Sequence, residues 1–565
     1  MLPFLMCHYA VQDGRLDLRP CVMPASSVVH ISHRSMEERS ICCCTLSIIM
    51  SGKLTIVPLA DTSNFGVKAD QNTNDEQQLV TEQQHTEGAL ERYINAPSAI
   101  NFSFLLQCSW EAAAVTFQFS LTNGGPASIA YGSIFSGIGT TLIALSLAEM
   151  ASMDPTLGAQ YRWTATFAPK YKRFFGLMQG WITVFAWICS CASNPALMCN
   201  IIASLASFNN PEYIPQRWHS TLIMWALTLC PFIGNFWLPK FINILETVGA
   251  VCHVTFFFAS IVTLVAMAEK SSASYVFKTL THGASGWNNS VVAWGIGLLT
   301  VAYPLTGFDG VLHMSDEVKG ARVRVPRAMI FSVVVNATMQ FLYMVTVLFC
   351  IGDVDRVTAS PLPIIEVYYQ ATGSRAATNV FVFMFIFIIF VSFVNVFASV
   401  SRLLWAFARD DGLPYSRVIV KIHPKLKIPV NALSMVAICL FVLALINIGS
   451  STAFNAFISL PALALCISYF FPIYFLFWTR VSRFRPAPIS WGPFKLGLAG
   501  PFVNLGAMSY IVFVVIWMPF PGSLPVNRLN MNYAGPILGG AILAAVLDWC
   551  VDGRKRFRVP STENH

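Results

Sequence analysis

From about residue 97 onward, the chain alternates long apolar runs with short polar breaks. Twelve runs approach or exceed the roughly 20 residues that a helix needs to cross the hydrocarbon core of a bilayer. Only helices satisfy their own backbone hydrogen bonds in lipid over such lengths. The pattern therefore predicts an all-α polytopic membrane protein with twelve transmembrane helices. They lie at about residues 98–122, 126–148, 174–206, 219–237, 241–267, 290–313, 328–351, 378–406, 429–448, 452–477, 497–519 and 533–551.

The two ends of the chain lack this alternation. Residues 60–84 are rich in Asp, Asn, Gln, Glu and Thr and carry no apolar stripe, which is typical of a disordered segment. We therefore expect a disordered N-terminal tail over residues 1–96, a twelve-helix domain over 97–551 and a short basic C-terminal tail over 552–565. Residues 1–49 are a candidate gene-model extension, which would make Met50 the true start.

Composition and charge agree with a membrane protein and predict its orientation. Charged residues make up 11% of the chain and the mean hydropathy is +0.59, whereas an average soluble domain carries roughly 25% charged residues. The loops after even-numbered runs and the C-terminal tail hold 23 Lys and Arg residues, against 6 on the opposite side. The positive-inside rule then places both termini in the cytoplasm. We expect an integral protein of the plasma membrane, with an internal organelle as the alternative and no nucleic-acid partner.

Other classes of function find no support in the sequence. The 15 Cys residues form no CxxC pair with a matching partner, so no metal, redox site or cofactor is predicted. The His residues are scattered, without an HExxH motif or paired carboxylates on neighbouring runs, which argues against an enzyme. A channel would need a repeated filter or a ring of like charges. The remaining expectation is a transporter of a small solute.

Two of the apolar runs are interrupted. The first carries Gln107 and Glu111 near its middle, and the sixth carries Pro304, Gly307 and Asp309. Pro and Gly are poor material for a continuous helix, and freed backbone groups are tolerated at depth where they line a cavity. Breaks in runs five apart are the mark of a substrate site in transporters built from inverted repeats. The alternatives are a merely kinked helix and a neutral Glu111 bonded to Gln107 or to a helix end.

Three segments are similar to loops of a known family. They are 147–161 (LAEMASMDPTLGAQY), 316–329 (DEVKGARVRVPRAM) and 401–414 (SRLLWAFARDDGLP), which follow the second, sixth and eighth runs. Together they resemble the amino acid–polyamine–organocation (APC) superfamily of permeases, over roughly residues 97–551. The Ser109-Trp110-Glu111 start and the Asn123-Gly-Gly-Pro126 turn resemble its fungal branch of amino acid, choline and GABA permeases.

The resemblance implies a LeuT-type fold, with a 5+5 inverted repeat plus two helices, and a substrate held at the two breaks. It implies a secondary active transporter, a proton symporter, that imports an amino acid or a small amine such as GABA or choline by alternating access. Backbone amides at the breaks would bind a carboxylate, and aromatic faces a cation. The implied substrate-binding residues are Gln107, Cys108, Ser109, Trp110, Glu111, Ala112, Tyr303, Thr306, Gly307, Phe308 and Asp309. The alternative is a non-transporting nutrient sensor of the same fold.

The fifth run departs from one pattern of this superfamily. Some proton-coupled relatives carry a lysine there, where this chain offers Glu246 and His253. A histidine in a membrane can titrate near physiological pH. Glu111, His253 and Glu246 are therefore the proton-coupling candidates, with ordinary packing as the alternative role for His253.

Charged residues at the helix ends form a last candidate set. They would either pair into a cytoplasmic gate or serve as plain topology anchors, and they are Glu149, Glu317, Arg327, Arg402 and Arg409. Asn288 begins a glycosylation sequon on the predicted outer side. The sequence leaves the oligomeric state open.

Overall fold

The computed structural model describes residues 5–12, 15–22, 46–49, 53–56 and 94–559, except 238, 283, 450–451, 483–488 and 529. The chain divides into two compact units, Met1–Glu87 and Gly88–His565. In the first unit, β1 (Leu5–Gln12) pairs with β2 (Arg15–Val22) and β3 (Leu46–Ile49) pairs with β4 (Lys53–Ile56), both antiparallel. The segment 60–84 lies outside the described residues, so its disorder stays a prediction.

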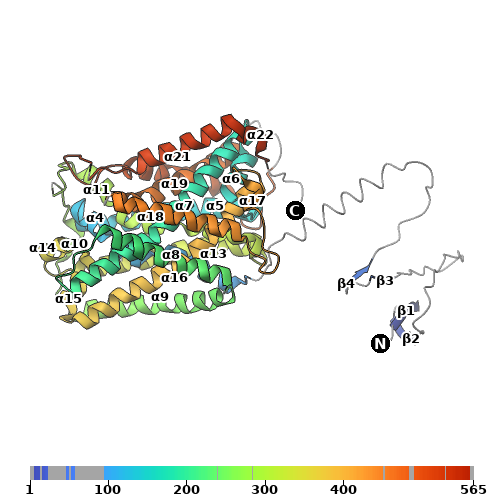
Figure 1. Cartoon of the computed structure of the whole chain (residues 1–565), viewed down its shortest axis with the longest axis horizontal. Coiled ribbons are helices and arrows are strands. Elements are labelled where there is room, and N and C mark those ends of the chain that lie inside the picture. Colours follow the sequence, from blue (N-terminus) through green and yellow to red (C-terminus); the bar gives the residue numbers. More distant parts are fainter. Residues whose placement is uncertain are drawn as a thin grey trace. The chain divides into compact units, whose positions relative to one another are not determined.

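The second unit is a bundle of helices (Figure 1). Ten helices coincide with the ten uninterrupted apolar runs. They are α5 (Gly125–Met153), α7 (Lys172–Asn209), α8 (Arg217–Trp237), α9 (Pro239–Met267), α13 (Ala321–Phe349), α16 (Arg375–Arg409), α18 (Val430–Gly449), α19 (Thr452–Val481), α20 (Gly500–Trp517) and α21 (Ala534–Asp548). The all-α membrane class predicted from the sequence is therefore confirmed.

The number of membrane-spanning helices can be compared with the twelve that the sequence predicts. Among the described residues, ten helical segments are long and apolar enough to cross a membrane, including the interrupted segment Ser290–Glu317. The two runs that fall short of this measure are 98–122, which is divided into short helices, and 219–237, which corresponds to α8. A count of twelve spans remains a prediction.

The outside of the bundle is apolar where a soluble protein would be polar. Phe258 on α9, Phe383 on α16 and Phe502 on α20 are 59%, 63% and 78% exposed. Large exposed apolar side chains on several helices mark a surface that contacts something other than water. Polar and charged residues are instead buried inside, among them Glu111 and Asp309. This arrangement is that of an integral membrane protein.

Both interrupted runs break in the backbone. The first consists of α2 (Ala96–Gln107), α3 (Ser109–Val115) and α4 (Phe117–Thr122), and Cys108 between α2 and α3 has a left-handed φ of 33°. The sixth consists of α11 (Ser290–Gly297), α12 (Leu299–Ala302), η1 (Tyr303–Leu305) and η2 (Phe308–Glu317). Gly307, with φ of 81°, separates η1 from η2. A positive φ is costly for a residue with a side chain, so Gly307 suits its turn, whereas Cys108 is held in a strained one.

Short helices lie at the two ends of the bundle. At one end are α6 (Ala159–Phe167), α17 (Ser416–Ile419) and α22 (Arg554–Arg556), on the right in Figure 1, and we call this the α6 end. At the other end are α10 (Ala273–Lys278), α14 (Val354–Ala359) and α15 (Pro363–Thr372). The remaining short elements are η3 (Gly497–Ala499) and η4 (Trp549–Gly553). The α6 end carries the basic loops for which the sequence predicts a cytoplasmic location.

The segment after α21 folds back onto the α6 end. Phe557 is fully buried, with its ring centroid 6.1 Å from that of Phe407 and 6.5 Å from that of Tyr161. Arg173 donates to the Phe557 carbonyl at 2.8 Å, and Arg556 donates to the Asp411 carbonyl at 2.8 Å. The C-terminal segment is thus fastened to α6, α7 and the loop after α16.

Candidate functional site

The two broken runs lie side by side and are joined by hydrogen bonds. Gln107, the last residue of α2, donates from Nε2 to the Leu305 carbonyl at 2.9 Å. Thr300 donates to the Thr116 carbonyl at 2.7 Å, and Ser120 donates to the Gly297 carbonyl at 2.5 Å. Buried carbonyls that lose a helical partner need another one, and here polar side chains of the opposite run supply it. The breaks are therefore built as one unit.

Side chains of helix α13 form hydrogen bonds with the residues on both sides of the first break. Ser332 donates to Gln107 Oε1 at 2.7 Å, and Asn336 Nδ2 donates to the Phe104 carbonyl at 3.0 Å. Ser109, just after the break, donates to Asn336 Oδ1 at 2.7 Å. All of these side chains are buried. Gln107 and Ser109, which the resemblance implies as substrate ligands, thus have their polar atoms engaged within the protein.

Tyr303 and Cys108 lie where the breaks meet α7. The Tyr303 hydroxyl is 2.8 Å from the Ser193 hydroxyl on α7, and Thr306 donates to the Tyr303 carbonyl at 2.7 Å. Cys108 and Tyr303 retain 5% and 8% exposure. Gly307 faces the same helix, since a Cβ there would lie 3.7 Å from the Trp187 ring. Ser193 and Trp187 had no distinguishing signal in the sequence, because a single Ser or Trp in an apolar run is common.

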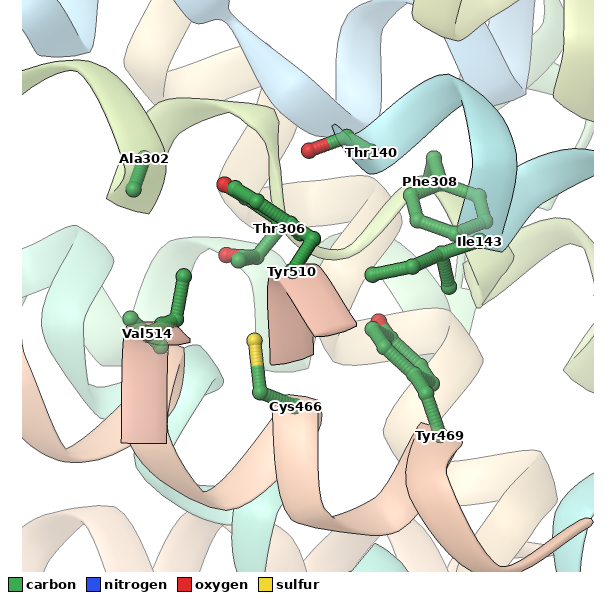
Figure 2. Close-up of a pocket in the computed structure, with 10 residues that line it drawn as sticks. Thr140, Ile143, Ala302, Thr306, Phe308, Cys466, Tyr469, Tyr510 and Val514 are labelled. Atoms are coloured by element: carbon green, nitrogen blue, oxygen red, sulfur yellow. The ribbon is translucent and has the colours of Figure 1, made fainter. Parts of the chain in front are cut away.

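A small cavity opens on the other side of the second break (Figure 2). Tyr469 and Cys466 of α19 face Thr306 and Phe308 across it, and α5 and α20 complete the wall with Thr140 and Tyr510 among others. The space is barely large enough for one water molecule. A solute the size of an amino acid would enter only after the surrounding helices move apart.

A buried carboxylate–imidazole pair lies just beyond the first break. Glu111 Oε1 is 2.6 Å from His253 Nδ1 on α9, and both side chains are fully buried. Glu111 Oε2 and His253 Nε2 have no hydrogen-bond partner among the described residues. Glu111 bonds to His253 rather than to Gln107, whose amide is bonded elsewhere. The sequence indicated both residues separately, and the fold brings them together.

Aromatic rings enclose this pair. The Phe104 ring lies 4.7 Å from the His253 ring, edge to face, and the Trp110 ring lies 4.8 Å from that of Tyr343. Trp110 is fully buried and its Nε1 has no hydrogen-bond partner within the described part of the chain. In apolar surroundings a net charge is costly, so this pair is buried where its surroundings do little to stabilise a charge.

Glu246 shares the inner face of α9 with His253. The two positions are seven residues apart, which is two helical turns, or about 10 Å along the axis. Glu246 is 5% exposed, and it forms no hydrogen bond or ion pair with the residues that the structure describes. It is therefore a second buried carboxylate on the face of α9 that carries His253.

Asp309 sits at the centre of a separate polar cluster. Gln160 on α6 donates to Oδ2 at 2.5 Å, Trp187 on α7 donates to Oδ2 at 3.3 Å, and Tyr469 on α19 donates to Oδ1 at 2.5 Å. His313, one turn further along η2, has Nε2 3.8 Å from Oδ2. Asp309 is fully buried. Both carboxylate oxygens are occupied by neutral donors from three other helices.

The α6 end carries buried ion pairs. Arg402 Nε is 2.9 Å from Glu317 Oε1, and both side chains are at most 5% exposed. Glu149 pairs with Arg480 on α19, and Leu496 N donates to the second oxygen of Glu149 at 2.9 Å. Arg480 was missed by sequence reasoning, because one Arg in a basic loop has no distinguishing mark.

The two remaining gate candidates differ from these pairs. Arg409 lies 3.6 Å from Asp316 and stacks over the Trp405 ring at 4.8 Å, and it is one-third exposed. Arg327 is exposed and forms no ion pair within the described residues. Four of the five candidates therefore lie in pairs, and Arg327 stands apart from them.

Comparison with known proteins gives a consistent family. The family model for Amino acid permease matches residues 104–543. A candidate amino acid/polyamine transporter of Macrophomina phaseolina is 30% identical, over 77% of this chain and 96% of its own length. The choline transporter of Saccharomyces cerevisiae is 31% identical, over 81% of each chain, and amino-acid permease 2 of Neurospora crassa is 27% identical, over 82% and 86%.

Proposed function

The chain belongs to the amino acid permease family within the APC superfamily, and on that premise we propose that it imports an amino acid or a small amine such as GABA or choline by proton-coupled alternating access. Members of this family are membrane transporters and not enzymes. The relatives named as a choline transporter and as amino acid permeases support this substrate class. We place the protein in the plasma membrane, with both termini and the α6 end in the cytoplasm.

The observation that carries the coupling is the Glu111–His253 pair. It is fully buried beside the break at Cys108, with one free acceptor or donor position on each partner. Uptake of a proton would change the charge of the pair and favour a conformation in which the break is open to water or to a substrate carboxylate. Glu246, two turns along α9, would pass the proton on toward the cytoplasm.

The substrate is proposed to lie between Cys108, Tyr303 and Gly307, where the breaks adjoin α7. Cys108 and Tyr303 keep residual exposure there, while the polar atoms of Gln107 and Ser109 hold the breaks in place. The aromatic face of Tyr303 would suit an ammonium group. The ion pairs Glu149–Arg480 and Glu317–Arg402 would act as the cytoplasmic gate, which is closed in this conformation.

Radiolabelled uptake in a yeast strain that lacks its own permeases tests the proposal. Choline, GABA and a panel of amino acids are compared at pH 5 and pH 7, with surface expression checked for each variant. We expect saturable uptake of one substrate that is stronger at pH 5 and is abolished in Glu111→Gln. The matched control is Glu269→Gln, at the exposed end after α9, which should transport normally. No uptake of any compound by protein at the cell surface would contradict the proposal.

The coupling step has its own test. His253→Gln keeps a polar side chain beside Glu111 but cannot take up a proton. We expect this variant to lose the difference between pH 5 and pH 7 while some uptake remains. Full pH-dependent uptake in His253→Gln would exclude the histidine from the coupling mechanism and leave Glu111 and Glu246 as the candidates.

A further inference from the structure

The Asp309 cluster differs from a substrate site in its chemistry. A buried carboxylate is stable only when its oxygens are well paired, and those of Asp309 receive hydrogen bonds from Gln160, Trp187 and Tyr469. These donors come from α6, α7 and α19, and none is charged. The carboxylate therefore joins η2 to three other helices and has little capacity left for a ligand.

A second contact reinforces the same junction. His313, also on η2, bonds through Nδ1 to the Leu157 carbonyl at 2.7 Å, just ahead of α6. Its ring packs edge to face against Trp187, with centroids 5.3 Å apart. η2 is thus fastened twice to the start of α6 and twice to α7. Movement of η2 away from α6 and α7 would break these four contacts together.

The first broken run is fastened in a corresponding way. Glu111 lies three residues beyond the break at Cys108 and bonds to His253 on α9, the fifth of the predicted spans. Asp309 lies two residues beyond the break at Gly307 and bonds to Tyr469 on α19, the tenth of the predicted spans. In the 5+5 repeat that the family resemblance implies, each break would be tied by a carboxylate to the final helix of its own repeat.

Tyr469 connects this junction to the cavity. Its hydroxyl donates to Asp309, while its ring lines the cavity opposite Phe308, at 5.5 Å between ring centroids (Figure 2). A solute that widens the cavity must displace this ring. Displacement would pull the hydroxyl from Asp309, so that occupancy of the cavity and release of η2 are mechanically linked.

We propose that Asp309 is a positioning residue that holds η2 against α6, α7 and α19 in the conformation closed at the α6 end, and that Tyr469 releases it when the cavity widens. The inference rests on the proposed alternating access. It assigns Asp309 a role in closure instead of substrate binding. The first break would be governed by Glu111 and the second by Asp309.

The test uses a native thiol and needs no substrate. Cys466 lines the cavity on α19 and is 2% exposed, and Cys350, at the far end of α13, is also 2% exposed. Alkylation by N-ethylmaleimide is followed at each cysteine by mass spectrometry on the purified full-length protein. In Asp309→Asn one acceptor oxygen becomes an NH2 group, so the donors of Gln160, Trp187 and Tyr469 lose the negative charge and one of the two acceptors that they share. We expect Cys466 to react about tenfold faster or more, as for the loss of a hydrogen bond to a charged group, with Cys350 unchanged.

Two further variants separate positioning from general damage. Tyr469→Phe removes only one hydroxyl and should also accelerate Cys466 selectively. Asp309→Asn with Gln160→Glu exchanges the amide and the carboxylate, and should return the Cys466 rate toward that of the wild type. An unchanged Cys466 rate in Asp309→Asn, equal acceleration of Cys466 and Cys350, or failure of the exchanged pair to restore protection would each overturn the inference. These outcomes are independent of whether uptake is found.

Discussion

The Glu149–Arg480 pair allows a quantitative prediction. Glu149 is fully buried and the Arg480 side chain is 5% exposed, so neither charge can turn to water. Arg480 also donates to Asn504 Oδ1 at 3.0 Å and stacks over Trp491 at 4.7 Å. Replacing Glu149 by Gln removes this buried counter-charge from the guanidinium. Breaking a buried pair in this way typically costs about 3–5 kcal/mol of unfolding free energy.

The same structure supplies a matched control. Arg356 and Glu366 are 2.8 Å apart, but the Arg356 side chain is 59% exposed. Exposed pairs contribute about 0–1 kcal/mol, so Glu366→Gln should have little effect. The two pairs thus share the same chemistry and differ mainly in burial.

The measurement is reversible unfolding in mixed detergent micelles, followed by tryptophan fluorescence. We expect Glu149→Gln and Arg480→Met each to lose about 3–5 kcal/mol. The double variant Glu149→Gln with Arg480→Met should lose clearly less than the sum of the two single losses, because both members of the pair are then uncharged. A loss below about 1 kcal/mol in Glu149→Gln, or additive losses in the double variant, would refute the view that burial of the pair makes each charge depend on the other.

Three further predictions concern the rest of the fold. Phe557→Ala should release the C-terminal segment and speed its removal by carboxypeptidase, while Phe502→Ala on the apolar outer face should not. Equal rates of removal in the two variants would refute the view that Phe557 anchors this segment. Asn336→Leu removes the bonds to Ser109 and Phe104 and should cost about 1–3 kcal/mol of unfolding free energy, and no measurable loss would contradict its structural role. Burial raises the pKa of the Asp410 carboxyl, against the opposing effect of Arg409. The contribution of Asp410 to stability therefore falls as the pH rises from the usual Asp range toward the raised pKa. Asp410→Asn should flatten this decline in melting curves recorded at several pH values, and an unchanged slope would contradict the role of Asp410.

Much of the architecture follows from the sequence alone. The apolar runs identify the membrane helices, because length and hydropathy are properties of a segment by itself. The break at Gly307 falls where Pro304 and Gly307 indicate it, since Gly and Pro act locally on the backbone. The break at Cys108 falls where the family resemblance implies it. The family also follows from motifs that lie in continuous stretches, and the match over residues 104–543 confirms it.

The pairing of side chains was decided by the tertiary structure. Glu111 and His253 are 142 residues apart, and Asp309 and Tyr469 are 160 apart. Arg480, which no motif marked, is the partner of Glu149 at a separation of 331 residues. Such pairs depend on how helices are arranged around one another and on which turn of each helix faces inward. A buried charge needs a partner, but hydropathy does not say which one, so the roles of these residues could be argued only once the helices had been placed in space.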